Sequence, residues 1–451
     1  MRPNVVFLLA DQWRLQSLGY AGNAQVQTPN IDRLASESVN FTHAISGWPL
    51  CSPWRASLLT GQYPLTHGVF TNDLPISGDP VGMGEAFERA GYDTAYIGKW
   101  HVNGQGRTSY VPPEHRLGFN TFKALECTHD YNRSEYYAGN NDTKLLWDGY
   151  DVFAQAGNAM AYIRERERSD PFMLLLSWGP PHNPYETAPE AFRTLYQPED
   201  IELRPNVPAP WEERAREWIA GYYAHCTAID KSVGDLLTTL DETGIGDQTV
   251  VVFASDHGDM LGSQGQERKQ RPWEESIRVP FLVRLPGREG GEVDAMLNAH
   301  DILPTLLGLC GVEIPDTVDG RDFSPTLTGG PDPSGGAALL ASFYPLWEAG
   351  GGREFRGVRT HRHTYVRTLE GPWLLYDNER DPYQLVNFVN DPAHSQVQEE
   401  LDRTLRHLLT ELGDDFERGL SYVQHFGFTT DATGRVLHPR WVDRYPGWVA
   451  R

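Results

Sequence analysis

The sequence predicts an α/β protein with a large, mixed but mainly parallel sheet sandwiched by helices, and a smaller C-terminal α+β domain. Short apolar runs alternate with longer helical patterns through most of the chain, as in a parallel sheet whose faces are covered by helices. A Gly/Pro-rich stretch, Gly329–Gly336, then separates this region from one with a different pattern. A chain of 451 residues also exceeds what one hydrophobic core usually holds. These observations place a large domain at residues 1–335 and a smaller one at residues 336–451.

The strands of the large sheet are expected where short apolar runs lack polar alternation, because a strand buried on both faces has this character. These runs are Val5–Ala10, Asp93–Gly98, Phe172–Trp178, Thr249–Ser255 and Pro280–Leu285. Helices are expected where apolar residues recur every three to four positions or where a good helix start precedes such a run. They are Thr28–Glu37, which opens with a Thr-Pro pair suited to a helix start, Pro53–Thr60, Glu213–Leu240 and Asp301–Leu309.

The region after the linker is expected to hold a small antiparallel sheet and one helix. Arg356–Thr368 and Trp373–Tyr376 have strand character, and Ala393–Leu412 has the pattern of one amphipathic helix. The remaining tail, Asp414–Arg451, is rich in aromatic residues and has no clear periodicity. Two roles are open for this tail: it wraps over the body of the protein, or it mediates a homo-oligomer.

The charge of the chain excludes several kinds of partner. Asp and Glu number 61 against 39 Lys and Arg, for a formal net charge of -22. Such a surface repels nucleic acid and anionic membranes, and no run of about 18 apolar residues offers a membrane span. An enzyme that acts on anions would therefore need a local pocket of positive charge. Only five of the basic residues are lysines, and two of these, Lys99 and Lys269, matter below.

The cysteines and the N-terminus favour a cytoplasmic protein. Cys51, Cys127, Cys226 and Cys310 show neither a CxxC spacing nor a metal-ligand pattern, as expected for a reduced set rather than a disulfide framework. The apolar run Val5–Ala10 is too short for the core of a signal peptide and fits a first strand better. A trimmed export signal is the alternative that stays open.

Polar residues able to do chemistry directly follow four of the expected strands. In open α/β sheets ligands bind at the carboxyl ends of the strands, so these residues are expected to converge although they lie far apart in the sequence. Taken singly, Asp11 could be a helix N-cap and His182 a loop histidine, but the coincidence at four strand ends favours a site. The carboxylates, the Gln amide and the imidazole suit a hard divalent cation such as Ca2+ or Mg2+. The residues are Asp11 and Gln12, Lys99 and His101, His182, and Asp256 and His257.

A further candidate is Cys51, which opens the run Cys51-Ser52-Pro53-Trp54-Arg55. Most free cysteines are small buried core residues. Here Pro53 suits the first turn of a helix, so Cys51 would lie at a helix N-terminus, where an anion is favoured. Arg55 lies four residues on, about one helical turn, and returns to the same face. A thiol beside an arginine at a helix start fits a nucleophile.

This run resembles the Cys-x-Pro-x-Arg maturation motif of the type I, formylglycine-dependent sulfatases of the alkaline phosphatase superfamily, and Leu59-Thr60-Gly61 resembles its usual continuation. Many members have Ser or Ala where this chain has Trp54, which would place a bulky aromatic ring near the site. The resemblance covers nearly the whole chain, in order, and implies an alkaline phosphatase-like fold with the catalytic domain at 1–335. The other similar segments are Leu8–Gln12, Gly98–His101, Pro180–His182, Ser255–Gly258, Lys269 with Glu274–Pro280, Asp301–Leu307, and Leu375–Asp377 with Asp381-Pro382.

The resemblance implies an arylsulfatase-like enzyme that hydrolyses sulfate monoesters to alcohol and inorganic sulfate. Cys51 would be oxidised to formylglycine by a separate maturation enzyme. The hydrated aldehyde, a gem-diol, would be the nucleophile on a divalent metal, Ca2+ or Mg2+. Asp11, Gln12, Asp256 and His257 would hold this metal together with residue 51.

The same resemblance implies roles for the remaining candidates. Lys99, Lys269 and Arg55 would offset charge on the sulfate and on the diol. His182, alone or with Lys269, would protonate the leaving alcohol. His101 would take the proton from the second diol hydroxyl. Lys99, His182 and Lys269 would also bind the substrate, a small-molecule or oligosaccharide sulfate ester.

Two other functions stay open on these residues. A phosphonate monoester hydrolase or phosphodiesterase of the same superfamily uses the same nucleophile, and Asp11-Gln12-Trp13-Arg14 also resembles those enzymes. A phosphodiester monoanion has the charge and shape of a sulfate monoester, so the core site does not separate the two. A non-catalytic binder of sulfated sugars is the other alternative if Cys51 is not converted, although the complete set of catalytic positions argues against it.

Overall fold

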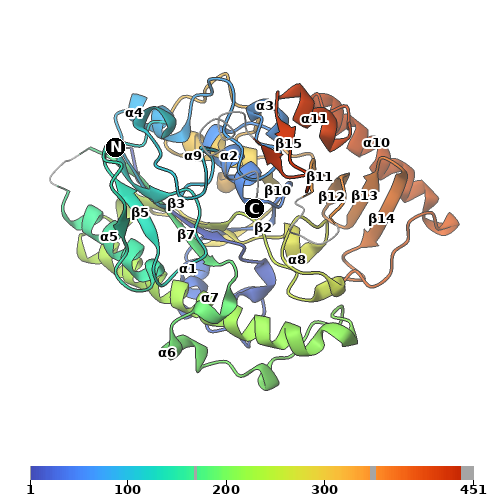
Figure 1. Ribbon diagram of the computed structural model, residues 1–451, viewed down its shortest axis with the longest axis horizontal. Helices are drawn as coiled ribbons and strands as arrows, with labels where there is room; N and C mark the ends of the chain where they lie inside the picture. The colour runs from blue at the N-terminus through green and yellow to red at the C-terminus, as the bar shows by residue number, and fades with distance from the viewer. Residues whose placement is uncertain (1, 167–169, 346–351, 438–451) are drawn as a thin grey trace.

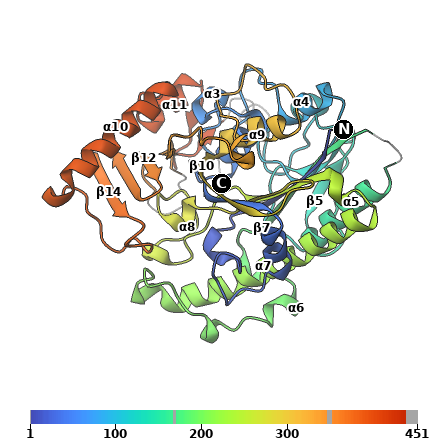
Figure 2. The same ribbon diagram turned by 180° about the vertical axis from the view of Figure 1, so that it is seen from behind.

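The computed structural model describes residues 2–166, 170–345 and 352–437 and confirms the predicted fold class (Figure 1). A mixed, mainly parallel sheet of ten strands lies between layers of helices, and a four-stranded antiparallel sheet with its own helix lies to one side. Figure 2 shows the same layers from behind. Within the described ranges, no helix has the length and apolar character needed to cross a membrane.

The large sheet has the strand order β10-β2-β9-β8-β1-β7-β3-β4-β5-β6. At its centre β8, β1, β7 and β3 run parallel to one another, whereas β9 is antiparallel to both of its neighbours. The carboxyl ends of the four central strands therefore meet at one edge. The strands are β1 Asn4–Asp11, β2 Val39–Ile45, β3 Asp93–Lys99, β4 Thr121–Leu125, β5 Glu135–Ala138, β6 Leu145–Leu146, β7 Phe172–Pro181, β8 Thr249–Ser255, β9 Phe281–Arg284 and β10 Gly291–Asn298.

Five of these strands, β2, β4, β5, β6 and β10, are not among those that the sequence predicts. They lie towards the two margins of the sheet; β2, β4, β5 and β10 mix polar with apolar residues, and β6 consists of only two leucines. β2, for example, reads Val-Asn-Phe-Thr-His-Ala-Ile, with partly exposed positions among buried ones. The continuous apolar run that identifies the central strands is missing from a strand of this kind. Pairing with distant segments, rather than local pattern, determines these margins.

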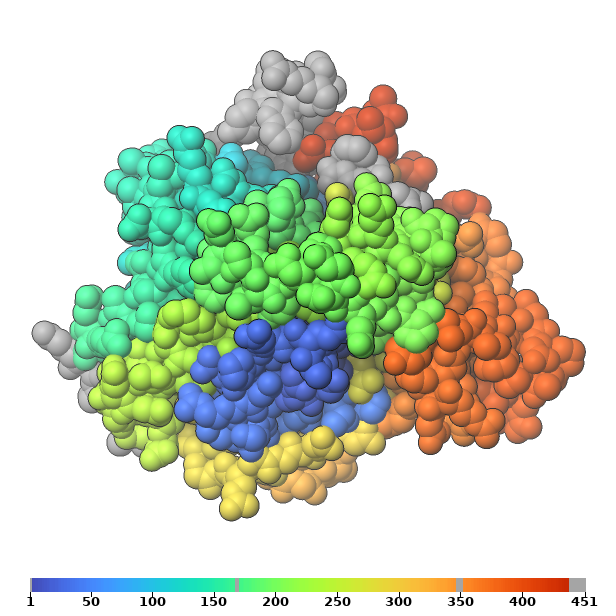
Figure 3. All heavy atoms as spheres, turned by 90° about the horizontal axis from the view of Figure 1, so that it is seen from below, coloured from blue at the N-terminus to red at the C-terminus, as the bar shows by residue number. Residues whose placement is uncertain are grey.

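Alternate residues of β1 show how helices cover both faces of the sheet. Val5, Phe7 and Leu9 pack in one core with residues of α2, α4 and α9, while Val6 and Leu8 pack in a second core with residues of α1, α5 and α7. Figure 3 shows the outside of the second layer, where the segment around α1 (blue) lies beside the green segment of α6 and α7. The four predicted helices correspond to α1, α2, α7 and α9. The helices are α1 Pro29–Ser36, α2 Cys51–Thr60, α3 Pro64–His67, α4 Met83–Arg89, α5 Asp151–Arg164, α6 Glu190–Arg193, α7 Glu212–Glu242, α8 Glu274–Ile277 and α9 Ile302–Leu309.

The small antiparallel sheet begins directly after the predicted linker and is joined to the large domain. Its first strand, which the sequence analysis does not predict, donates the Ala341 amide to the Gly47 carbonyl (2.6 Å). The Asn298 side chain in turn donates to the Leu339 carbonyl (3.1 Å). The predicted strands and helix follow in order. The elements are β11 Ala337–Ser342, β12 Phe355–Thr360, β13 His363–Thr368, β14 Gly371–Asp377 and α10 Ser395–Glu411.

The described part of the tail folds back onto the large domain. It contains α11 (Gly419–His425) and a small hairpin of β15 (Thr429–Thr430) and β16 (Val436–Leu437). The rings of Phe426 and Phe70 stack with centroids 5.5 Å apart, and the buried Asp414 carboxylate accepts a hydrogen bond from the Tyr63 hydroxyl (2.8 Å). This part of the tail therefore wraps over the body, the first of the two predicted roles. Residues 438–451 of the predicted tail lie outside the described residues.

Candidate active site

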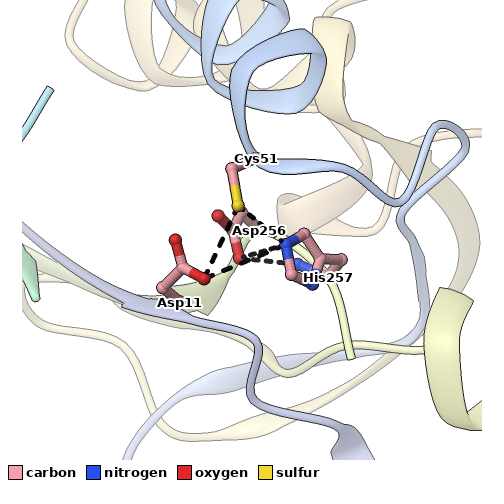
Figure 4. A group of neighbouring side chains, drawn as sticks. All are labelled: Asp11, Cys51, Asp256 and His257. Carbon is pink, nitrogen blue, oxygen red and sulfur yellow. Dashed lines mark hydrogen bonds and ion pairs between the residues drawn. The ribbon is translucent and has the colours of Figure 1, made fainter. Parts of the chain in front are cut away.

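The carboxyl ends of β1 and β8 bring the predicted metal ligands together. Asp11 is the last residue of β1, and Asp256 and His257 directly follow β8. Donor atoms of these three residues and of Cys51 all lie within 4.8 Å of one another, and all four residues are buried. Figure 4 shows the four side chains pointing toward a common centre. The sheet thus assembles the cluster that the pattern at the strand ends predicts.

Gln12 and His257 have the donor chemistry that a cation site needs. The Gln12 amide nitrogen donates to Asp259 Oδ2 (2.7 Å), which orients the amide and leaves its buried Oε1 without a hydrogen-bond partner among the described residues. His257 Nδ1 hydrogen-bonds the Gly258 carbonyl (3.0 Å), so Nε2 carries the lone pair when the ring is neutral, although burial is outweighed by nearby negative charge, chiefly that of Asp256, which raises the pKa of His257. An unpaired amide oxygen, two carboxylates and an imidazole nitrogen fit a divalent cation.

Arg55 holds the two carboxylates in place. Its Nη2 is 3.0 Å from Asp11 Oδ2 and its Nε is 3.2 Å from Asp256 Oδ2. Its Nη1 donates to the Lys99 carbonyl (3.0 Å) and to Ser177 Oγ (2.7 Å). The side chain is fully buried and all of its nitrogens have acceptors. Arg55 therefore does not reach toward a substrate, which differs from the expectation that it offsets charge on the sulfate.

Of the two carboxylates, Asp256 is short of compensating positive charge, whereas at Asp11 burial is outweighed by nearby positive charges, chiefly that of Lys99, which lower the pKa. Lys99 Nζ lies 2.7 Å from Asp11 Oδ2, and Arg55 contacts both carboxylates. Burial, followed by the negative charge of Asp11, nonetheless raises the pKa of Asp256 to about 6. A divalent cation among these donors would supply the missing charge.

Cys51 is the first residue of α2, and its thiol lies among cationic groups. Its Sγ is 3.1 Å from Lys269 Nζ, 3.6 Å from Lys99 Nζ and 3.3 Å from His257 Nε2. Burial and the charge of Asp11 oppose ionisation, but the two lysines outweigh them, and the pKa of Cys51 lies well below its usual range. The position favours a negatively charged group, as predicted for a helix start.

Trp54 does not crowd the site, contrary to the expectation from the sequence. Its side chain is buried in the core between the sheet and the helices α4 and α9. Trp13 and Arg14 are also bound into the protein body: Trp13 Nε1 donates to the Ser17 carbonyl (2.9 Å) and Arg14 Nε donates to Ser17 Oγ (2.9 Å). The part of the Asp11–Arg14 run that resembles phosphonate hydrolases therefore makes contacts within the fold rather than with a substrate.

Beside Cys51 lies a cavity of about 300 Å³. Lys99, His101, His182 and Lys269 line it, so the structure brings the predicted substrate-side residues into one space. The remaining lining residues lie on loops and carry no motif that could have identified them. They are Asn72, Arg107, Cys127, His129, Asn183 and Arg268.

His101 is oriented by Asp73, a residue that the sequence analysis missed. The Asp73 carboxylate accepts from His101 Nε2 (2.9 Å) and from Arg107 Nε and Nη2 (both 3.0 Å). Nδ1 is thereby left as the basic nitrogen of the His101 ring. Burial alone would lower the pKa of His101, but the charge of Cys127 and the hydrogen bond with Asp73 outweigh it and raise the pKa to about 9.

His182 faces the cavity as a neutral ring. Its Nδ1 hydrogen-bonds the Asn183 carbonyl (2.7 Å), which leaves Nε2 open. The ring stacks on His129, with centroids 4.6 Å apart and an interplanar angle of 8°. Burial, and then the charge of Lys269, lower the pKa of His182 well below its usual value. The neutral imidazole and the charged lysine thus line the same cavity.

Known proteins resemble the chain over nearly its whole length. The family model described as Sulfatase matches residues 3–312, and the model described as N-sulphoglucosamine sulphohydrolase, C-terminal, matches residues 262–411. The chain is 45% identical over 436 residues to an ulvan-active sulfatase of Formosa agariphila, covering 95% of this chain and 85% of the relative. It is 32% identical over 485 residues to an endo-4-O-sulfatase of Bacteroides thetaiotaomicron, covering 91% of this chain and 92% of the relative. A solved structure from work on glycosaminoglycan metabolism by Bacteroides thetaiotaomicron has a TM-score of 0.84 at 30% identity, covering 92% of this chain and 98% of that chain.

Proposed function

This chain belongs to the sulfatase family and is a sulfuric ester hydrolase, and we propose that it removes sulfate from sulfated saccharides with a nucleophile made from Cys51. The saccharide class is supported by two relatives, which are named for ulvan and for an endo-acting 4-O-sulfatase activity. One observation carries the proposal. The Cys51 sulfur lies within 3.7 Å of two lysines and of the metal-ligand candidates Asp11 and His257. A nucleophile at this point would contact both the cation and the sulfate.

The nucleophile is formylglycine, formed from Cys51 by a separate maturation enzyme and hydrated to a gem-diol. One diol oxygen attacks sulfur, and the S–O bond to the alcohol breaks. Sulfate is then held on residue 51 as an ester. When the second hydroxyl loses its proton, the C–O bond to sulfate breaks, sulfate leaves and the aldehyde is restored. An ordinary hydroxyl side chain has no second hydroxyl and could not release sulfate in this way.

The cation site is made by Asp11, Gln12, Asp256 and His257, and it fits Ca2+ or Mg2+. When bound there, such an ion stabilises negative charge on the nucleophile and on the sulfate oxygens. Arg55 contributes by positioning the two carboxylates rather than by contacting the sulfate.

The two histidines His101 and His182, together with Lys269, carry out the proton transfers. The neutral form of His101 accepts the proton of the second diol hydroxyl at Nδ1, because Asp73 holds its Nε2–H, and the pKa of about 9 makes the protonated ring the favoured product. Lys99 and Lys269 bind the sulfate oxygens, since both Nζ atoms lie within 3.6 Å of the residue 51 sulfur. The proton for the leaving alcohol oxygen comes from Lys269, and His182 relays it through Nε2, because the neutral His182 ring carries its own proton at Nδ1.

The His182→Ala variant is expected to slow esters with poor leaving groups far more than activated aryl esters. A general acid increases the rate by about 10²- to 10⁴-fold when the leaving oxygen needs a proton. Nitrophenolate leaves without a proton, so its ester gains little from the acid. The measurement is kcat for a sugar sulfate and for p-nitrophenyl sulfate in the same preparations. His129→Ala, which removes only the stacked ring, serves as the control and should affect both esters alike. An equal loss for both esters in His182→Ala would remove His182 from the acid role.

The proposed function is tested by comparing kcat/KM for p-nitrophenyl sulfate and for a p-nitrophenyl phosphonate, using matured enzyme with Ca2+. We expect at least a tenfold preference for the sulfate, because Trp13 and Arg14 are bound into the fold and give the phosphonate no added contact. A preference for the phosphorus ester would keep the nucleophile and the metal site but overturn the substrate class.

A further inference from the structure

The Arg268 side chain lines the cavity beside Cys51, and its guanidinium makes no hydrogen bond or ion pair with any residue in the described ranges. Two other cationic side chains of the cavity have carboxylate partners. Lys99 lies 2.7 Å from Asp11, and Arg107 lies 3.0 Å from Asp73. The N–H donors of the Arg268 guanidinium are therefore available to a ligand that binds in the cavity.

The backbone holds Arg268 beside Lys269 in a defined geometry. The Arg268 carbonyl accepts from the Met260 amide (2.7 Å), and the Gln270 amide donates to the Pro49 carbonyl (3.0 Å). Arg268 and Gln270 both have a left-handed backbone, with φ of 60° and 63°, which non-glycine residues adopt at a cost. Neighbours in an extended segment point to opposite sides, whereas here both Arg268 and Lys269 line one cavity.

The cavity has more positive charge than a single sulfate ester requires. A sulfate monoester carries one negative charge. Lys269 Nζ, which lies 3.1 Å from Cys51 Sγ, already supplies one positive charge beside the nucleophile position. Arg268 adds a further cation in a protein whose net charge is -22, where an anionic substrate is otherwise repelled. The planar fork of a guanidinium matches a carboxylate or a sulfate through paired N–H donors.

We infer that Arg268 forms a second anion-binding subsite, which takes a carboxylate or a further sulfate on the same saccharide that carries the scissile sulfate. The inference rests on the proposed hydrolysis of saccharide sulfates and narrows its substrate class to saccharides with two anionic groups. Arg268 binds the substrate there and takes no part in breaking the ester bond. A substrate that is neutral or cationic at this position loses the contact.

One experiment tests whether the Arg268 subsite binds a carboxylate of the substrate. It compares sulfated, hexuronate-containing oligosaccharides prepared from ulvan with the same oligosaccharides after reduction of their carboxylates to primary alcohols. Wild-type enzyme should prefer the carboxylated form by about 10- to 100-fold in kcat/KM, mainly through KM, as expected for a charge-assisted contact. In Arg268→Gln this ratio should fall to near one. For p-nitrophenyl sulfate, which has one anionic group, the same variant should lose less than about threefold.

A second experiment tests whether the Arg268 subsite binds a second sulfate of the substrate. It compares kcat/KM for glucosamine 2-N,6-O-disulfate with kcat/KM for glucosamine 6-sulfate. A preference within this pair that Arg268→Gln abolishes assigns the subsite to sulfate, and a preference within the first pair assigns it to carboxylate. Sugars that are not cleaved are compared as competitive inhibitors of p-nitrophenyl sulfate hydrolysis, with the same ratios expected in their inhibition constants.

Arg403→Gln is the matched control, since it removes one positive charge from the exposed face of α10 and should leave every ratio unchanged. Arg268→Lys keeps the charge without the fork and should recover part of the preference. The inference is wrong if Arg268→Gln slows p-nitrophenyl sulfate as much as the saccharides, or if wild-type enzyme distinguishes the members of neither pair. If matured wild-type enzyme cleaves no sulfate ester at all, the proposed function itself fails, and the subsite with it.

Discussion

Replacing Cys51 with alanine should lower kcat/KM for p-nitrophenyl sulfate by on the order of 10⁴-fold or more, since the variant has no nucleophile. The fold should be retained, because alanine is smaller than cysteine and is a strong helix former at the start of α2. The measurement combines initial rates with the midpoint of thermal unfolding. Retention of full activity in this variant would rule out a nucleophile at residue 51.

Serine at the same position separates the diol mechanism from an ordinary nucleophile. Cys51→Ser should release at most one equivalent of nitrophenol per enzyme and then stop, because a single hydroxyl cannot expel the bound sulfate. Cys226→Ala, which removes another buried thiol within α7, is the control and should turn over normally. Sustained turnover by the serine variant would show that release does not need a second hydroxyl. Mass spectrometry of the peptide around residue 51 checks that the wild-type sample carries the aldehyde.

Removal of divalent cations by a chelator should reduce turnover by at least 100-fold and lower the midpoint of thermal unfolding, and Ca2+ should restore both. The raised pKa of Asp256 shows that this buried carboxylate lacks compensating charge, whereas at Asp11 burial is outweighed by nearby positive charges, chiefly that of Lys99, which lower the pKa. A cation that binds only the folded protein therefore stabilises it, by about 2.7 kcal/mol when its concentration is 100 times its Kd. Calorimetric scans with and without Ca2+ measure this effect without relying on catalysis.

The Asp256→Asn variant tests whether Asp256 is a ligand of the cation that raises the midpoint of thermal unfolding. The amide keeps an oxygen for the Arg55 Nε, which lies 3.2 Å from Asp256 Oδ2, but removes one carboxylate charge from the cluster. We expect the Ca2+-dependent rise in the unfolding midpoint to shrink strongly or vanish. Asp247→Asn, at an exposed position before β8, is the control and should keep the full rise. An undiminished rise in Asp256→Asn would place the cation elsewhere.

Much of the candidate site can be predicted from the sequence because its signals are local. Continuous apolar runs identify β1, β3, β7 and β8, and polar residues directly after those runs identify Asp11, Lys99, His182 and Asp256. The parallel pairing of these strands then confirms that the groups share one edge of the sheet. Strands near the margins of the sheet, such as β2 and β10, mix polar with apolar residues, so no local sequence pattern identifies them.

By itself, the sequence determined the family, the α/β class and the candidate nucleophile, because motifs and apolar periodicity are properties of short segments. Only the tertiary structure decided which charges meet. It paired Arg55 with the two carboxylates, joined His101 to Asp73, placed Trp54 in the core, and left the Arg268 guanidinium at the cavity wall with no partner among the described residues. The physical reason is that hydrogen bonds and ion pairs join side chains from segments as far as 351 residues apart in the sequence, and one sequence records no such contact.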